Sequence, residues 1–242
     1  HSSNAIISET SATQSNTLKT IASKNIASKA IVSKNIVSKN MASKNMPPET
    51  NSPKTILIYG DSISAAYGIE REQGWVALLA TYIQTNYPAY KVVNASVSGE
   101  TTGGGLIRLP KSLEVHRPDI IILELGGNDG LRGYPISKIS GNLQAMIQMS
   151  RSRNTTVLLV GMILPPNYGQ RYTNSFSQIF VQLADQYQLP FLPFLLVGVT
   201  TERTLIQNDG IHPTAEAQST ILVDVLSVLK RLLNPEILPP AG

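Results

Sequence analysis

From Thr55 onward, short apolar runs alternate with longer stretches of helical periodicity, and this alternation constrains the fold most strongly. Each run is only a few residues long and rich in Ile, Val and Leu, as buried parallel strands are. The runs cover residues 56–59, 91–95, 120–125, 157–163 and 190–192. Strand–helix alternation repeated about five times predicts an α/β fold with one three-layer α/β/α domain around a central, mostly parallel five-stranded sheet.

Two stretches outside these runs have the pattern of amphipathic helices. One helical face is formed by Trp75, Val76, Leu79, Ile83 and Tyr87. A second face is formed by Ile221, Leu222, Val225, Leu229 and Leu232. We expect Pro213 to open this second helix at its first position. In doubly wound sheets the site lies beyond the carboxyl ends of the strands, so the turns that follow the strands are the place to search for chemistry.

The excess basic charge is confined to the first 52 residues. Of the 20 basic and 16 acidic residues, six lysines and two glutamates lie there, which leaves 14 of each sign for the remaining 190 residues. The sequence pI of about 9.2 therefore reflects the N-terminal segment alone. Because the rest is neutral, we expect no nucleic-acid partner. Residues 53–242 are predicted to form a single globular domain.

Residues 21–45 consist of five pentapeptides of the type Ile-Ala-Ser-Lys-Asn. A period of five rotates the apolar pair by roughly 140° per repeat on a helix. On a strand it moves the pair to the opposite face each time. We therefore interpret residues 1–52 as a disordered, repetitive tail rich in Ser, Lys and Asn, in preference to a short β-solenoid. Weak contact of this basic segment with anionic membranes is the other alternative.

Several classes of site are excluded by composition. The chain has no cysteine, which rules out disulfides, thiolate metal sites and a cysteine nucleophile. Its three histidines are scattered, so we expect no metal site and no cofactor. No run approaches the 18 or so apolar residues of a membrane span, and the richest, residues 191–199, is interrupted by Pro193.

Polar or glycine-rich turns follow the predicted strands and precede the last helix. They are Gly-Asp-Ser-Ile-Ser at 60–64, Asn-Ala-Ser-Val-Ser-Gly-Glu-Thr at 94–101, Gly-Gly-Asn-Asp-Gly at 126–130 and Asp-Gly-Ile-His-Pro at 209–213. His1 is terminal, and His116 is expected to cap a helix. His212 is therefore the candidate general base. Asp209, three residues earlier, can hold its Nδ1–H and fix the tautomer.

Ser62 is the candidate nucleophile, because it follows a strand and has a histidine base available. Its alternative role is that of a helix N-cap. The backbone N–H groups of Ser62 and Gly99, with the side-chain amide of Asn128, would supply three oxyanion donors from the ends of neighbouring strands. Taken alone, Asn128 would be read as a turn former.

These four segments, in this order, resemble the SGNH (GDSL-type) hydrolases, whose namesake residues match Ser62, Gly99, Asn128 and His212. With Pro-Asn-Tyr-Gly-Gln-Arg-Tyr at 166–172, the likeness is closest to the bacterial arylesterase/thioesterase I family. Two departures are the replacement of the usual leucine by Ile63 and the repetitive tail. The resemblance spans residues from about 55 to about 233.

The resemblance implies a flavodoxin-like SGNH-hydrolase fold and a serine hydrolase of esters and thioesters. Aryl esters, acyl-CoA and lysophospholipids are the implied small-molecule substrates, and Ser62, Asp209 and His212 the implied catalytic residues. Residues 53–242 would be the catalytic domain. Alternatives are an acyltransferase or carbohydrate deacetylase of the same fold, and a catalytically silent surface module. A silent relative should lack a triad or oxyanion member, and none is missing.

The substrate is expected to contact a group of residues around these motifs. They are Asp61, Gly130, Leu131, Arg132, Tyr134, Pro165 and Tyr168. Within the segment 130–135, two glycines bracket an apolar tip, which predicts a lid over the acyl chain. We further expect a monomer in the periplasm or secreted, with the signal peptide absent from this chain.

Overall fold

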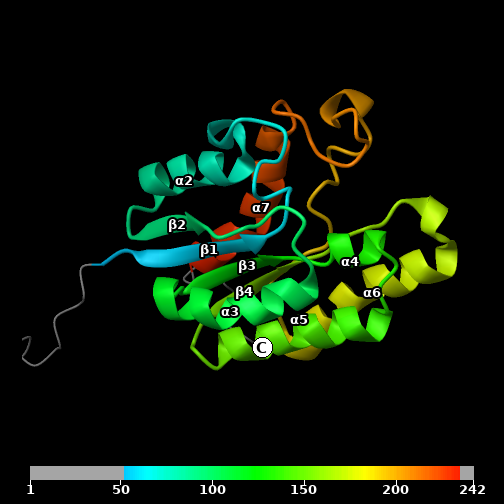
Figure 1. The fold of residues 1–242 in the computed structure, drawn as a ribbon. Coiled ribbons are helices and arrows are strands. Elements are labelled where there is room, and N and C mark those ends of the chain that lie inside the picture. The colour runs from blue at the N-terminus through cyan, green and yellow to red at the C-terminus, as the bar shows by residue number, and fades with distance from the viewer. Residues whose placement is uncertain (1–51, 235–242) are drawn as a thin grey trace, which may run out of the picture. The chain divides into compact units, whose positions relative to one another are not determined.

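Five strands form one sheet in the computed structural model, which describes residues 52–234 (Figure 1). The strands are β1 (Lys54–Gly60), β2 (Tyr90–Asn94), β3 (Ile120–Glu124), β4 (Thr156–Val160) and β5 (Phe191–Leu192). Their order is β2-β1-β3-β4-β5, and every neighbouring pair is parallel. This confirms the predicted α/β fold with a central five-stranded sheet.

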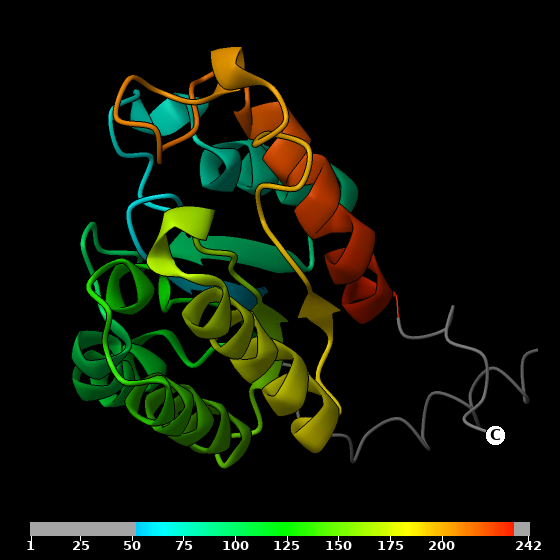
Figure 2. The ribbon, with the colours of Figure 1, turned by 90° about the vertical axis from the view of Figure 1, so that its right-hand side faces the viewer.

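Helices cover both faces of the sheet and complete the three layers (Figures 1 and 2). One face carries α2 (Trp75–Asn86) and α7 (Gln218–Leu233), and the other carries α3 (Thr102–His116), α5 (Ile136–Arg151) and α6 (Gln170–Tyr187). Shorter helical elements lie in the connections. They are α4 (Gly127–Leu131), η2 (Arg71–Gln73), η3 (Pro166–Tyr168) and η4 (Arg203–Leu205).

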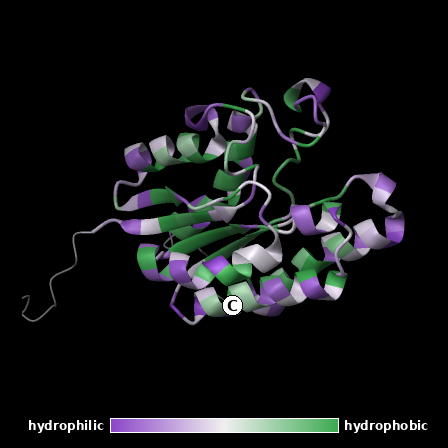
Figure 3. Ribbon diagram, in the orientation of Figure 1, coloured by the Kyte–Doolittle hydropathy of each residue, from purple (hydrophilic) through white to green (hydrophobic). Residues whose placement is uncertain are grey.

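The two cores follow from the alternation of side chains along each strand. Ile56 and Ile58 point toward α2 and α7, whereas Leu57 and Tyr59 point toward the layer of α3, α5 and α6. Because both faces are covered, the central strands are hydrophobic along almost their whole length (Figure 3).

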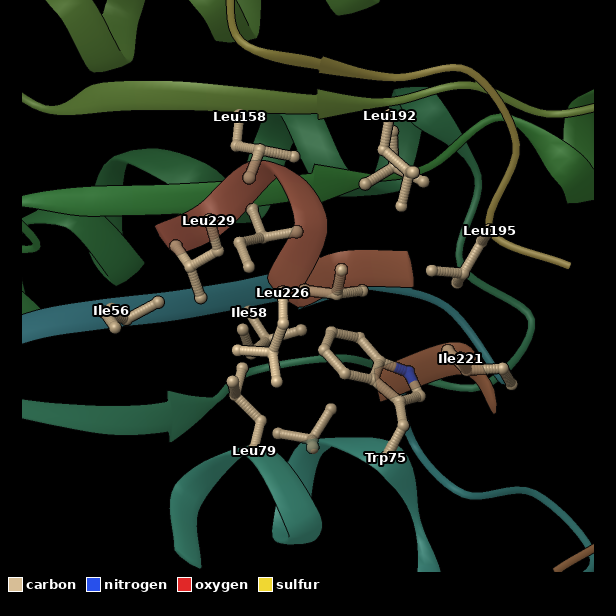
Figure 4. Close-up of a cluster of buried hydrophobic side chains, with 14 of the residues drawn as sticks. Ile56, Ile58, Trp75, Leu79, Leu158, Leu192, Leu195, Ile221, Leu226 and Leu229 are labelled. Carbon is tan, nitrogen blue, oxygen red and sulfur yellow. The ribbon is translucent and has the colours of Figure 1, made fainter. Parts of the chain in front are cut away.

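The two predicted amphipathic helices present the expected faces to the first of these cores. On α2, Trp75 and Leu79 are fully buried in one cluster with Ile56 and Ile58 of β1. On α7, Ile221 and Leu229 are fully buried in the same cluster (Figure 4). Burial of a large apolar side chain contributes about 1.5–3 kcal/mol, so this contact is a major source of stability.

The prediction that Pro213 opens the last helix is wrong. Pro213 pairs in an isolated antiparallel bridge with Ile206, and α7 begins only at Gln218. The Gln207 N–H also donates to the His212 carbonyl at 2.7 Å, which closes a loop around the histidine. These backbone bonds hold residues 206–213 in a non-helical loop, so the chain turns into the helix five residues later than expected.

The interpretation of residues 1–52 as a disordered tail concerns positions that, except for Ser52, lie outside the described residues.

Candidate active site

Ser62, His212 and Asp209 form a continuous chain of side-chain contacts at the carboxyl end of the sheet. His212 Nε2 lies 2.8 Å from Ser62 Oγ, and His212 Nδ1 lies 2.6 Å from Asp209 Oδ2. Asp209 Oδ1 also accepts the backbone N–H groups of Ile211 at 2.9 Å and His212 at 3.0 Å. The Asp-x-x-His turn therefore fixes the orientation of the imidazole through backbone and side chain together.

The Asp209 carboxylate is ionised at neutral pH. Partial burial acts to raise its pKa, but the N–H groups of His212 and Ile211 and the His212 ring outweigh it and lower the pKa to about 2. An ionised Asp209 favours the tautomer in which Nδ1 carries the proton. Nε2 is then free to accept the hydroxyl proton of Ser62.

Ser62 lies in a series of turns after β1, not at the start of a helix. Residues 62–68 are turn backbone, with the Tyr67 N–H donating to the Ser62 carbonyl at 3.0 Å. The Tyr67 ring lies against His212, with ring centroids 4.5 Å apart. Gln207 Nε2 donates to the carbonyls of Tyr67 at 2.8 Å and Pro213 at 2.9 Å. This side-chain amide ties the nucleophile turn to the histidine loop.

The loop after β2 places Gly99 at the same end of the sheet. The Val97 N–H donates to the Gly60 carbonyl at 3.0 Å, and Ser96 Oγ accepts the Gly60 N–H at 3.1 Å. Gly99 has φ +76°, and a β-carbon there would meet no other atom within 4 Å. Its backbone thus faces open space, as close approach of a substrate requires.

Asn128 lies in α4, directly after β3, and its Nδ2 donates to Asp61 Oδ2 at 3.1 Å. The next residue, Asp129, accepts the Thr102 N–H at 2.8 Å and the Thr102 hydroxyl at 2.6 Å. Asp129 thereby fastens α4 to the start of α3, beside the Gly99 loop. Because a primary amide has two N–H groups, Asn128 retains one donor beyond its bond to Asp61.

A cavity of about 740 Å³ opens at these residues. Ser62, Gly99, Asn128 and His212 all line it, so the structure brings the predicted triad and oxyanion residues to one place. Most of the remaining lining is apolar. It includes Leu131, Met162, Ile163, Leu164, Pro165, Phe194, Leu195, Leu196, Val197 and Ile211.

The predicted substrate-contacting residues divide into two groups. Asp61, Leu131 and Pro165 line the cavity. The others do not. They are Gly130, Arg132, Tyr134 and Tyr168.

The lid predicted for residues 130–135 needs correction at its first hinge. Gly130 lies inside α4, buried against Leu164 and Phe176, where a β-carbon would come within 2.9 Å of both side chains. Gly130 is therefore a packing glycine. Arg132 is exposed and donates to the Gly99 carbonyl at 3.4 Å. The Tyr134 carbonyl accepts the Tyr172 hydroxyl at 2.7 Å, which holds the exit of the turn to α6.

The sequence prediction missed three parts of the site, namely residues 194–197, residues 161–164 and Glu124. Residues 194–197 form an apolar lobe of the cavity that follows β5. The sequence feature that could have indicated it is the apolar run at 191–199, which continues past the end of a strand into the region where α/β folds bind ligands. Residues 161–164 are also rim, because β4 ends at Val160 and not at Ile163. Glu124 was missed as well, although a carboxyl within an apolar run indicates a buried polar group.

Comparison with known proteins agrees with this geometry. Residues 58–219 match the model of the GDSL-like lipase/acylhydrolase family. Esterase TesA of Pseudomonas aeruginosa is 47% identical over 180 residues, which cover 74% of this chain and 90% of that protein. Thioesterase 1/protease 1/lysophospholipase L1 of Escherichia coli K12 is 41% identical over 180 residues, covering 74% and 85%.

Solved structures give the same result. The crystal structure of TesA superposes with a TM-score of 0.72 at 46% identity, covering 74% of this chain and 99% of that one. The psychrotrophic esterase EstA from Pseudoalteromonas sp., inhibited by monoethylphosphonate, has a TM-score of 0.72 at 40% identity, covering 75% and 99%. With the match extending over most of the chain, this protein belongs to the GDSL-like lipase/acylhydrolase family, the SGNH hydrolases.

Proposed function

We propose that this enzyme, a hydrolase of carboxylic esters and thioesters, acts through an acyl-enzyme on Ser62. The observation that carries the proposal is the contact chain from Ser62 through His212 to Asp209 at one end of an apolar cavity. A serine hydroxyl is a weak nucleophile until a base within hydrogen-bond reach removes its proton. His212 Nε2 is within that reach.

Acylation begins when Ser62 Oγ attacks the acyl carbonyl carbon while His212 Nε2 takes the hydroxyl proton. The carbonyl oxygen becomes an oxyanion, which accepts hydrogen bonds from the Ser62 N–H, the Gly99 N–H and the Asn128 amide. Asp209 stabilises the imidazolium that has formed. When the bond from the acyl carbon to the leaving oxygen or sulfur breaks, His212 returns the proton to the departing alcohol or thiol.

Deacylation uses the same residues with water as the nucleophile. His212 takes a proton from the water, whose oxygen attacks the acyl-enzyme carbonyl. The second tetrahedral intermediate then collapses, the bond to Ser62 Oγ breaks, and His212 reprotonates the serine. The free acid leaves, and Ser62 and His212 return to their starting protonation states.

The substrates are proposed from the cavity and the relatives together. An apolar wall on one side of Ser62 suits an acyl chain, because each buried methylene contributes about 0.8 kcal/mol. The relatives bear the names esterase, arylesterase, thioesterase and lysophospholipase. We therefore assign aryl esters, acyl-CoA and lysophospholipids as the substrate classes of this enzyme.

The cellular setting is part of the same proposal. Within residues 52–234, none of the helices has the length and apolarity needed to cross a bilayer. We place the enzyme in the periplasm or outside the cell, as a monomer with residues 53–242 as its catalytic domain. Contact of the basic segment with anionic lipid is proposed on its lysine content.

Replacing the nucleophile tests the proposal. Ser62→Ala should lower kcat by about 10⁴-fold or more and abolish labelling by an organophosphonate, because no other group takes over the attack. Ser219→Ala, at an exposed position on α7 outside the cavity, is the control and should leave both readouts unchanged. A Ser62→Ala enzyme with activity within tenfold of the parent would exclude Ser62 as nucleophile. A series of p-nitrophenyl esters and acyl-CoAs of increasing chain length then defines the acyl preference.

A further inference from the structure

Two buried carboxyl groups lie side by side beneath the nucleophile. Glu124 ends β3 and Asp61 follows β1, and the register of these strands places Gly60 opposite Glu124. Glu124 is 0% exposed and Asp61 is 3% exposed. A β-carbon at Gly60 would collide with Glu124 Oε2, so a glycine is needed for the carboxyl to fit.

The hydrogen bonds of the pair are unequal. Glu124 Oε2 accepts the Ser64 hydroxyl at 2.7 Å and the Asp61 N–H at 3.2 Å, whereas the buried Oε1 has no donor partner. Asp61 uses both of its oxygens. Oδ1 accepts the Ile63 N–H at 3.1 Å and Oδ2 accepts the Asn128 amide at 3.1 Å.

The side chains of Asp61 and Glu124 are within hydrogen-bond reach of each other. Two buried carboxyl groups in such contact cannot both be ionised without a cation nearby. Neither is in an ion pair with lysine or arginine within residues 52–234. Burial raises the pKa of both groups, and the charge of Asp61 raises that of Glu124 further. The charge of His212 acts to lower the pKa of Asp61. The proton of the pair therefore belongs on Glu124.

We propose that Glu124 is a positioning residue that acts as a neutral hydrogen-bond donor. Its protonated Oε1 donates to the Asp61 carboxylate, and Asp61 in turn holds one N–H of Asn128. The second N–H of that amide is then directed at the substrate oxygen. The proposal rests on the oxyanion role given to Asn128 above. It gives a function to the one carboxyl group of β3, whose other residues are all apolar.

A pair of substitutions separates a neutral donor from a charged group. In Glu124→Gln, the amide oxygen can accept from Ser64 and Asp61 while Nε2 donates to the Asp61 carboxylate. Its kcat should therefore stay within about threefold of the parent, since one neutral donor replaces another. Glu124→Leu removes the donor, so kcat on a short aryl ester should fall about 10- to 100-fold with KM little changed. A Gln variant as inactive as the Leu variant would overturn the proposal.

A second measurement follows the proton itself. A carboxyl with a raised pKa binds its proton more tightly in the folded state, so its contribution to stability falls as pH rises above its ordinary value near 4.5. Because a glutamine side chain does not titrate, Glu124→Gln does not lose stability in this way as the pH rises. The Tm of Glu124→Gln relative to the parent should therefore increase from pH 5 to pH 9. The exposed Glu114→Gln should show no such trend, and a flat difference for Glu124→Gln would contradict a protonated Glu124.

Failure of this proposal can be told apart from failure of the proposed function. If Ser62→Ala retains activity, the acyl-enzyme mechanism is wrong and kinetic data on Glu124 lose their interpretation, although the dependence of Tm on pH still decides the charge of Glu124. If Ser62→Ala is inactive and both Glu124 variants are equally impaired, the mechanism stands and the neutral donor does not.

Discussion

At the residue scale, the two oxygens of Asp209 have separate tasks. Oδ1 closes the turn by accepting two backbone N–H groups, and Oδ2 accepts Nδ1–H of His212. The same carboxylate thus shapes the loop and orients the base. Since its pKa is lowered to about 2, it keeps its charge far into the acidic range.

Asn128→Ala isolates the contribution of one oxyanion donor. We expect kcat to fall about 10²–10³-fold with KM little changed, because the lost hydrogen bond forms mainly in the transition state. Steady-state kinetics on a soluble ester provide the measurement. Asn174→Ala, an exposed position on α6, is the control. A raised KM at constant kcat would instead make Asn128 a substrate-binding residue.

The sequence indicated the triad candidates because few alternatives existed. Among three histidines, only His212 has a carboxylate three residues earlier, and it lies near the predicted rim of the sheet. Glu124 could not be placed in the same manner. The proposed role of Glu124 depends on contacts with Asp61 and Ser64. These residues come close to Glu124 only because β1 pairs with β3. Such contacts between distant segments have no local pattern in a sequence.

At the element scale, α4 is a short helix that packs against Leu164, in the loop after β4, and Phe176 of α6. Gly126, with φ +125°, begins the turn, and Gly130 allows it to approach Leu164 and Phe176. The sequence prediction took the glycines at 130 and 133 as equivalent hinges. The structure separates them, because only Gly133 has a positive φ, +67°, and open space around it.

Single alanine substitutions should distinguish these two glycines. Gly130→Ala forces a methyl group against Leu164, which lines the cavity, so stability should fall by about 1–3 kcal/mol. The displaced Leu164 should also reduce kcat/KM several-fold more for long-chain than for acetyl esters. Gly133→Ala meets only backbone strain, about 1–2 kcal/mol, and should leave chain-length selectivity unchanged.

Urea unfolding and a chain-length series on both variants provide the measurements. Equal changes in chain-length selectivity in the two variants would instead support the original prediction that Gly130 and Gly133 are equivalent hinges of a lid. Loss of acetyl esterase activity in Gly130→Ala, equal to its loss on long chains, would locate the damage at Asn128 in the same helix.

At the scale of the whole molecule, residues 52–234 contain two apolar cores, one on each face of the sheet. Because these cores are formed by side chains within that range, deleting residues 1–51 should leave Tm and soluble-ester kinetics unchanged. Calorimetry and p-nitrophenyl ester assays on the two chains test this. Binding to anionic vesicles should weaken on deletion, since each lysine near such a surface contributes about 1 kcal/mol. A large drop in Tm would show that the segment is part of the folded domain.

The three-layer architecture and the parallel sheet could be predicted from the sequence because strand and helix alternate with clear periodicity. The strand order and the cavity could not. Its apolar wall includes Ile163, Phe194 and Ile211, which lie in three different connections between elements. Each of these residues has the appearance of ordinary loop hydrophobicity in its own segment. Only the convergence of the connections at one edge of the sheet makes them a common wall.

Ser62 and His212 are 150 positions apart in the chain, on opposite sides of nearly the whole sheet-forming sequence. During translation Ser62 emerges 150 residues before His212, which comes just before α7. On the proposed mechanism, a polypeptide that ends before His212 lacks the base and should have no esterase activity, however much of the sheet it has formed. On the proposed mechanism, turnover of a fluorogenic ester should therefore report that the chain has been synthesised and folded at least as far as His212.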